Sequence, residues 1–183
     1  MIYILLGAGF EEAEALVTAD ILRRGGLEVR LIGIGGPAVS GAHGITVTAD
    51  CPAESVALSA GDAVVLPGGM GGVNSIAASP AAMALAERAA KSDDLWLAAI
   101  CAAPAMLAEA GLQPSGKSAV CYPGMEGALT AAGLVPCMDR HAVRDGKLVT
   151  GRAPGGAYGF GLTLLEALAG PDAARAVAAQ MWV

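Results

Sequence analysis

Short, nearly continuous apolar runs alternate with longer, alanine-rich amphipathic runs along almost the whole chain. Continuous apolar runs are typical of strands in a parallel sheet that is covered on both faces. The predicted strands span residues 2–6, 28–34, 63–66, 95–100, 118–121 and 147–150. The predicted helices span residues 11–24, 80–91, 104–110, 124–132, 158–168 and 171–181. The alternation predicts a doubly wound, mostly parallel α/β sheet sandwiched by helices, in a single domain that covers residues 1–183.

Two stretches interrupt this alternation. Residues 36–50 are interpreted as a hairpin inserted after the second strand, and residues 142–150 carry an Asp-Gly pair that favours a second hairpin. Residues 67–72, Pro-Gly-Gly-Met-Gly-Gly, are too rich in glycine for a simple turn. They indicate a close approach of the backbone to a ligand, although their spacing matches neither a dinucleotide fingerprint nor a P-loop.

Composition and charge exclude several classes of protein. The 183 residues are 55% hydrophobic but only 4% aromatic, so the core must be built from alanine, leucine, valine and isoleucine. A formal net charge of −6, with no basic stripe to offset it, argues against a nucleic-acid partner. The longest apolar run, residues 95–107, is interrupted by Pro104 and is shorter than the roughly 20 residues of a membrane span. We therefore expect no membrane partner.

The cysteines and histidines predict reduced thiols and no metal centre. The chain begins with an apolar run that has no basic segment before it, which favours a first strand over a signal peptide. Its four cysteines show no CxxC spacing, which favours a cytoplasmic protein with free thiols. His43 and His141 are far apart in sequence and form no metal-ligand pair, and we expect no cofactor.

Cys101 is the main candidate for chemistry. It lies where the predicted strand 95–100 ends and a helix-forming run begins, with Pro104 near the first turn of that helix. A residue at such a strand-to-helix turn lies beside free backbone N–H groups and the positive end of a helix dipole. We expect this environment to lower the pKa of the thiol and to supply donors to an oxyanion, as at a nucleophile elbow. The alternative is a buried cysteine that acts as a small hydrophobe.

Other polar groups and glycines gather at the carboxyl ends of the predicted strands, where ligands bind in open α/β sheets. Three glutamates in residues 11–14 open the helix after the first strand, and the glycine-rich run follows another strand. Two of these glutamates are explained by the favourable interaction of acidic side chains with the positive end of the helix dipole. Glu14 lies one turn into the helix on its apolar side, and we predict that it reaches Cys101. There it would donate a hydrogen bond when protonated or act as a general base when ionised.

Later strand ends carry weaker candidates. Arg152 follows the last predicted strand and is a candidate for a small-anion site, although most arginines are simply solvated. Tyr122 also follows a strand, where packing is the commoner role. We interpret His43 as a turn residue of the first hairpin, and His141 precedes the second. Neither histidine forms a visible Cys-His dyad with Cys101.

Four motifs together resemble the ThiJ/PfpI superfamily. They are Gly-Ala-Gly-Phe-Glu-Glu-Ala-Glu at 7–14, Asp-Ala-Val-Val-Leu-Pro-Gly-Gly at 62–69, Ala-Ala-Ile-Cys-Ala-Ala-Pro at 98–104 and Thr-Gly-Arg-Ala-Pro-Gly at 150–155. Within the superfamily the chain is similar to the branch of the parkinsonism-associated protein deglycase, which is glyoxalase III-like. The resemblance runs essentially end to end and implies a flavodoxin-like fold and a homodimer.

The resemblance also implies a set of site residues. Cys101 would be the reactive nucleophile, and Glu14 the carboxyl hydrogen-bonded to it. Gly69 and Ala102 would supply N–H groups to an oxyanion. Their places at the strand ends make three further residues candidates for oxyanion or substrate binding: Gly68, Arg152 and Tyr122.

The chain departs from the superfamily pattern at four positions. Ala102 stands where the protease-like branch has a histidine, and Tyr122 stands where the deglycase branch often has one. His43 replaces the arginine that usually begins the second strand of the first hairpin, and Ala153 replaces a glycine between Arg152 and Pro154.

The leading functional hypothesis is a lyase or hydrolase of the glutathione-independent glyoxalase or protein deglycase type. It would act on small reactive 2-oxoaldehydes such as methylglyoxal, with Cys101 as nucleophile and Glu14 as proton shuttle. The alternative is a redox-responsive stress or chaperone-type protein that uses oxidation of Cys101 without turnover. A peptidase or amidase is the weakest hypothesis, because acyl transfer needs a base paired with the nucleophile and no histidine is evident.

Overall fold

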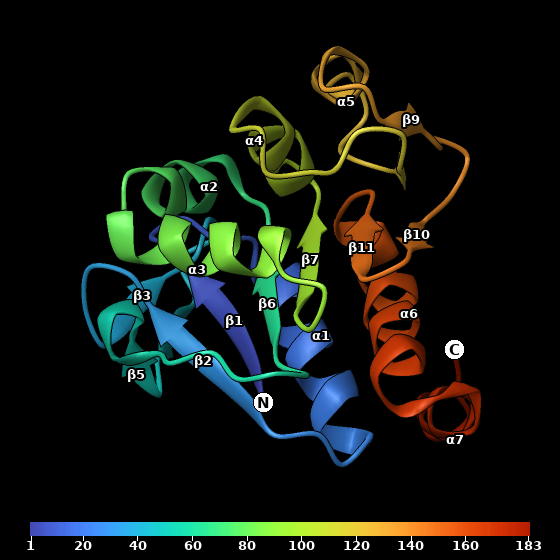
Figure 1. Ribbon diagram of the computed structural model, residues 1–183. Coiled ribbons are helices and arrows are strands. Elements are labelled where there is room, and N and C mark those ends of the chain that lie inside the picture. The colour runs from blue at the N-terminus through green and yellow to red at the C-terminus, as the bar shows by residue number, and fades with distance from the viewer.

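The computed structural model describes residues 1–183 and confirms the doubly wound, mostly parallel sheet between helices (Figure 1). Seven strands form the main sheet in the order β10-β11-β7-β6-β1-β2-β5. Every neighbouring pair is parallel except β10 and β11. The strands, listed in chain order, are β1 Ile2–Leu6, β2 Val29–Gly33, β5 Cys51–Pro52, β6 Ala63–Leu66, β7 Trp96–Ile100, β10 Ala142–Asp145 and β11 Leu148–Gly151.

Helices cover both faces of this sheet. They are α1 Glu12–Arg24, α2 Met70–Ala77, α3 Pro80–Lys91, α4 Ala103–Glu109, α5 Glu126–Ala131, α6 Ala157–Ala169 and α7 Pro171–Met181. Helices α1 and α6 pack on each other, with α7 on α6, whereas α2 and α3 pack over β1, β6 and β7 (Figure 1). Single turns of 3-10 helix lie at Ala53–Ser55 and Pro154–Gly156.

The direction of winding reverses between β1 and β6. From β1 the chain crosses through α1 to β2 on one side, and from β6 it crosses through α2 and α3 to β7 on the other. Right-handed crossovers in opposite directions place their helices on opposite faces of a parallel sheet. The carboxyl ends of the strands on either side of the reversal then frame a crevice, the usual ligand site of such sheets.

The core matches the composition of the chain. Strand β1 is buried along its whole length, and β7 places Ala98 and Ala99, both fully buried, between its neighbours. The few aromatic residues are used sparingly, with Phe10 and Phe160 completely buried. Small side chains in β7 let the covering helices approach closely, which maintains dense packing without large rings.

Both predicted hairpins are confirmed. In the first, β3 (Ala38–Ser40) pairs antiparallel with β4 (Thr46–Thr48). In the second, β10 pairs antiparallel with β11, and the turn between them contains Gly146 with a φ of 64°. A left-handed backbone at that position explains why the Asp-Gly pair signals a hairpin.

Two parts of the sequence interpretation were wrong. The predicted strand at 118–121 is only β8 (Ser118–Ala119), which lies outside the main sheet and pairs in parallel with the unpredicted β9 (Val135–Pro136). It ends early because the backbone N–H of Val120 instead donates to the Thr150 hydroxyl at 2.9 Å.

The glycine-rich run is the second correction, because Met70 begins the unpredicted helix α2. Within that helix, Gly72 lies against the first loop of the chain: a Cβ placed on it would come within 2.6 Å of the Phe10 Cα. This glycine therefore permits the backbone of α2 to pack closely against the first loop. Gly68 and Gly69 precede the helix and belong to the site described below.

Candidate functional site

Cys101 occupies a strained turn at the carboxyl end of β7. Its φ of 66° is left-handed, a conformation that residues other than glycine rarely adopt. The backbone holds it from two sides: the Cys101 N–H donates to the Gly151 carbonyl at 2.9 Å, and the Cys101 carbonyl accepts from the Tyr122 N–H at 2.7 Å. The side chain is buried but not sealed, with 7% of the residue exposed. Backbone strain that is held in place by hydrogen bonds from neighbouring segments is characteristic of functional turns.

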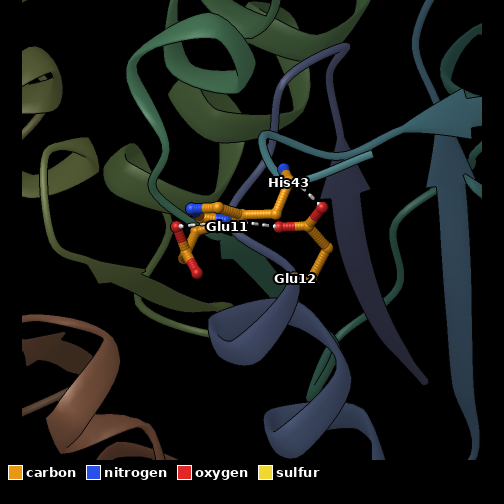
Figure 2. Close-up of side chains that lie close together, drawn as sticks. All are labelled: Glu11, Glu12 and His43. Carbon is orange, nitrogen blue, oxygen red and sulfur yellow. Dashed lines mark hydrogen bonds and ion pairs between the residues drawn. The ribbon is translucent and has the colours of Figure 1, made fainter. Parts of the chain in front are cut away.

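The three glutamates that open α1 have separate roles in the structure. Glu12 is buried and anchors the first hairpin: its Oε1 accepts the N–H of His43 at 2.7 Å and of Ile45 at 3.3 Å. Its Oε2 lies 2.9 Å from His43 Nδ1, and Glu11 Oε2 lies 3.7 Å from the same nitrogen (Figure 2). Burial alone would raise the pKa of Glu12, but these hydrogen bonds lower it to about 2.

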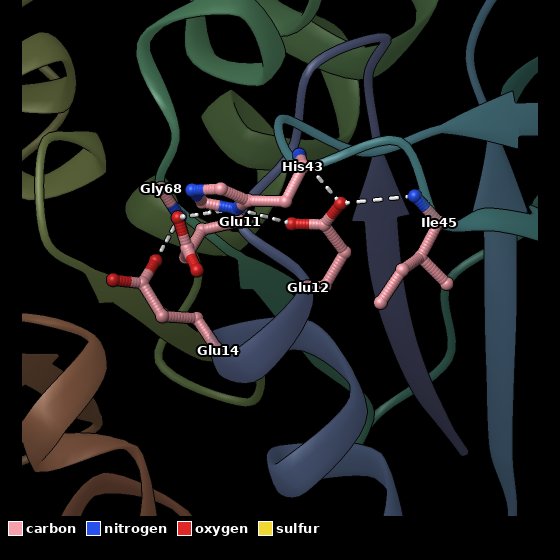
Figure 3. Close-up of polar contacts among 6 residues, drawn as sticks. All are labelled: Glu11, Glu12, Glu14, His43, Ile45 and Gly68. Carbon is pink, nitrogen blue, oxygen red and sulfur yellow. Dashed lines mark hydrogen bonds and ion pairs between the residues drawn. The ribbon is translucent and has the colours of Figure 1, made fainter.

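Glu14 points away from that hairpin and toward the sulfur of Cys101. Only 1% of Glu14 is exposed, and its Oε2 accepts the Gly68 N–H at 2.7 Å (Figure 3). Its Oε1 is buried and has no hydrogen-bond partner. A Cβ placed on Gly68 would lie 2.7 Å from Glu14 Oε2 and 2.9 Å from Cys101 Sγ. Both side chains therefore meet over Gly68, where only glycine leaves room for them.

Burial sets the acid–base character of this pair. It raises the pKa of Glu14 to about 7, assisted by the charge of Glu11 and opposed by the Gly68 N–H and the Cys101 thiol. Burial, together with the charge of Glu14 and a hydrogen bond to its carboxylate, raises the pKa of Cys101 to about 12. The expected lowering of the thiol pKa is therefore wrong. Two of these influences, the charge of Glu14 and the hydrogen bond to its carboxylate, act only when Glu14 is ionised. The thiol therefore loses its proton more easily when Glu14 is protonated, so the two groups share one proton.

Backbone N–H groups from two helix starts converge on the sulfur. Gly69 and Ala102 are the N-cap residues of α2 and α4, and their N–H groups lie near enough to the sulfur to oppose the rise of the Cys101 pKa. Gly69 has a φ of 79°. Gly68, in contrast, gives its N–H to Glu14, so it cannot also donate to an oxyanion at the sulfur. The role expected for Gly68 as an oxyanion donor is therefore not the one that it has here.

The two weaker candidates border the elbow through their backbones. Tyr122 is 46% exposed, and its contact with the elbow is the N–H that holds the Cys101 carbonyl. Arg152 follows Gly151, whose carbonyl holds the Cys101 N–H. The Arg152 guanidinium lies 3.2 Å from the Met138 carbonyl and 3.3 Å from His141 Nδ1, and it forms no ion pair with a carboxylate. A cation without a counter-ion in this position keeps Arg152 a candidate for anion binding.

Sequence reasoning missed the place of His43. As expected, it lies in the turn of the first hairpin, but the fold also brings its imidazole to the start of α1, between Glu11 and Glu12. Thirty-one positions separate His43 from Glu12 in the chain. No local spacing could signal this contact, because it depends on how the hairpin folds back over the sheet.

The fold and this arrangement define a class of protein: a doubly wound α/β protein with a cysteine at a nucleophile elbow and a buried carboxyl beside it. The chain belongs to the DJ-1/PfpI family, whose model matches residues 1–167. The protein dj-1beta of Drosophila melanogaster is 40% identical to it, over 96% of this chain and 92% of that protein. The glutathione-independent glyoxalase DJR-1.2 of Caenorhabditis elegans is 32% identical, over 88% of this chain and 84% of that protein.

Solved structures of DJ-1 proteins have the same fold as this chain. The crystal structure of Drosophila melanogaster DJ-1beta superposes with a TM-score of 0.89 at 37% sequence identity, covering 100% of this chain and 97% of the other. The structure of oxidized Toxoplasma gondii DJ-1 superposes with a TM-score of 0.89 at 30% identity, covering 99% and 97%. None of the helices is both long and apolar enough to cross a membrane.

Proposed function

We propose that this protein is a glutathione-independent glyoxalase that converts small 2-oxoaldehydes into 2-hydroxy acids at Cys101. The observation that carries the proposal is the buried Glu14 carboxyl beside Cys101, whose Oε2 accepts the Gly68 N–H and whose Oε1 has no hydrogen-bond partner. A carboxyl with a pKa near 7 can both take and give a proton at neutral pH. The similarity to the glyoxalase DJR-1.2 of Caenorhabditis elegans supports this class of substrate.

The first step forms a covalent bond between the sulfur and the aldehyde carbon. As Sγ attacks, the thiol proton moves to Glu14, and the carbonyl electron pair moves to the aldehyde oxygen. The N–H groups of Gly69 and Ala102 lie at the sulfur and are suited to stabilise that oxyanion. Transfer of the proton during the attack removes the need for a free thiolate, which the high pKa of Cys101 makes scarce. Glu14 then passes this proton to the aldehyde oxygen, so the product is a neutral hemithioacetal and the Glu14 carboxylate is restored.

The second step moves a hydrogen between the two carbons. Glu14 removes the proton from the former aldehyde carbon, which gives an enediolate, and returns it to the neighbouring carbon. The hydroxyl proton of the former aldehyde carbon moves to the neighbouring oxygen, so that a thioester of a 2-hydroxy acid results. The aldehyde carbon is thereby oxidised and the ketone carbon reduced, so no external oxidant or reductant is required. Water then cleaves the resulting thioester, releases the 2-hydroxy acid and restores the thiol.

Lactate formation from methylglyoxal in the absence of glutathione tests this proposal. We expect turnover by the wild type, loss of turnover in Cys101→Ala, and wild-type turnover in Cys121→Ala. Cys121 is the matched control, since it is also a buried free cysteine. Equal turnover by the Cys101→Ala variant, or no turnover by the wild type, would contradict the proposal.

A redox role is the second candidate, and the same geometry favours it. Peroxide would oxidise the thiol stepwise to a sulfenic and then a sulfinic acid, each step adding one oxygen and releasing water. A protonated Glu14 and the two N–H groups can donate hydrogen bonds to the added oxygens. Mass spectrometry after mild peroxide treatment should show oxygen on Cys101 first. Earlier oxidation of the less buried Cys137 would contradict this role.

The homodimer and the cytoplasmic location stay predictions, the first from the family resemblance and the second from the free cysteines. Light scattering on the purified protein measures the first directly, and a mass equal to one chain would contradict it.

A further inference from the structure

A cluster of three metal-ligating side chains, formed by Glu11, Glu12 and His43, lies outside the Cys101 site. Its donor atoms all lie within 4.8 Å of one another. The imidazole enters from the turn of the first hairpin and lies between the two carboxylates at the start of α1, with Nδ1 facing both (Figure 2). The proposed glyoxalase reaction uses none of these three side chains.

The distances in the cluster match those that a small cation requires. His43 Nδ1 lies 2.9 Å from Glu12 Oε2 and 3.7 Å from Glu11 Oε2. Tetrahedral Zn²⁺ with bonds of about 2.0–2.1 Å separates neighbouring donor atoms by about 3.3 Å. The two observed distances bracket this value, and all three donors lie within 4.8 Å of one another. The shorter distance is that of a hydrogen bond, so an ion would take the place of the proton between Nδ1 and Glu12 Oε2.

The Glu11 carboxylate is the group that most clearly lacks a partner. Its side chain is only 16% exposed, and it forms no hydrogen bond in the structure. Its nearest charged contact is His43 Nδ1, at 3.7 Å. A largely shielded carboxylate without a donor is costly, and a cation bound at its open oxygen would compensate for that cost.

The other two donors are positioned in advance. Glu12 uses Oε1 for the N–H groups of His43 and Ile45, which leaves Oε2 directed at the imidazole (Figure 3). The His43 residue is held through its backbone, while its side chain is 68% exposed and open to ions in solution. Ligands fixed by second contacts lose less freedom on binding a metal.

The donor chemistry selects the class of ion. Two carboxylates carry a charge of about −2 when the imidazole is neutral, which outweighs the roughly +0.5 of the helix N-terminus beside them. An imidazole nitrogen favours a first-row transition metal over Mg²⁺ or Ca²⁺, which prefer oxygen ligands. The absence of a thiolate in the set disfavours softer ions such as Cu⁺.

We propose that Glu11, Glu12 and His43 bind one divalent transition-metal ion of the Zn²⁺ type, with water completing its coordination. The ion would lie next to the glycine turn of the candidate active site, because the Glu11 N–H donates to the Gly68 carbonyl at 3.0 Å. This proposal does not depend on the glyoxalase reaction, since the donors belong to the hairpin and the start of α1.

Titration of the full-length protein with Co²⁺, a spectroscopic substitute for Zn²⁺, tests the site. The chain has only two histidines, so NMR of histidine-labelled protein can report each imidazole separately. We expect one equivalent of Co²⁺ to perturb the signal of His43, with no thiolate-to-cobalt charge-transfer band. His43→Ala keeps the backbone N–H that binds Glu12, so the hairpin should fold normally in this variant.

The variants separate this site from binding elsewhere. His43→Ala and Glu11→Gln should each weaken Co²⁺ binding by more than about tenfold, since each removes a direct ligand. His141→Ala is the matched control and should bind with wild-type affinity. Three results would overturn the proposal: no binding, affinity unchanged in His43→Ala, or a charge-transfer band that places the metal on a cysteine.

Discussion

Replacing Glu14 with glutamine isolates the cost of ionising a buried carboxyl beside the sulfur. The pKa of Glu14 is about 7 in the folded protein, against an ordinary value of 4.5. Below pH 4.5 the Glu14 carboxyl is protonated in both the folded and the unfolded protein, so it does not affect the pH dependence of stability. Between pH 4.5 and 7 the unfolded chain loses this proton while the folded protein keeps it. The free energy of unfolding therefore falls as pH rises through this window.

The size of the effect follows from the displacement of the pKa. At roughly 1.4 kcal/mol per pH unit, a change from 4.5 to about 7 corresponds to about 3 kcal/mol of lost stability above pH 7. Glutamine is neutral throughout and escapes this loss. The stability of Glu14→Gln relative to the wild type should therefore improve by about 3 kcal/mol between pH 4.5 and pH 8.5.

Urea unfolding of both proteins at a series of pH values measures this difference. Ionisable groups that do not interact with Glu14 are common to the two proteins, so their contributions cancel in the comparison. Glu109→Gln is the matched control, because Glu109 is exposed near the end of α4. A relative stability of Glu14→Gln that stays constant from pH 4.5 to 8.5 would refute the raised pKa and the proton-sharing account built on it.

Two further substitutions test the packing of the site and of the hairpin. Gly68→Ala should destabilise the protein by about 2 kcal/mol and abolish lactate formation, because its Cβ would lie 2.5 Å from the Cys101 Cβ. Gly127→Ala in α5, where a Cβ meets nothing within 4 Å, should instead stabilise by about 0.5–1 kcal/mol in the same urea unfolding assay. Equal effects at both glycines would show that Gly68 is not constrained. Glu12→Gln should cost about 2 kcal/mol and speed hydrogen exchange at the Ile45 amide, since that N–H donates to the Glu12 carboxylate. Unchanged exchange would contradict the anchoring role of Glu12.

The parts of the fold that the sequence predicted well are those with strong local patterns. Strand β6 and helix α3 have the predicted boundaries, because an unbroken apolar run and a serine N-cap followed by proline are local signals. The convergence of Glu14 and Cys101 was also predictable. Both follow from which strand ends lie together in a doubly wound sheet, a rule that does not depend on side-chain detail.

The sequence predictions that were wrong or incomplete share a different cause, which is dependence on contacts between distant parts of the chain. Helix α2 was missed because glycine has low helix propensity, and the reason for its glycines is a partner loop far away in the chain. The direction of the Cys101 pKa shift was wrong because the burial of the sulfur depends on tertiary packing, while the elbow pattern reveals only the nearby N–H groups. The contact between His43 and Glu12 was invisible for the same reason, since the hairpin fold brings them together.

The pH dependence of lactate formation from methylglyoxal tests most directly that Glu14 is the base for chemistry at Cys101. In glutathione-free buffer, kcat/KM of the wild type should rise with pH through a single ionisation near 7, where Glu14 becomes ionised. Glu14→Gln should reduce kcat/KM by about 10²-fold or more and remove that ionisation, as expected for loss of a general base. A pH-independent kcat/KM between pH 5.5 and 8.5, or a Glu14→Gln variant with the wild-type rate, would contradict the account.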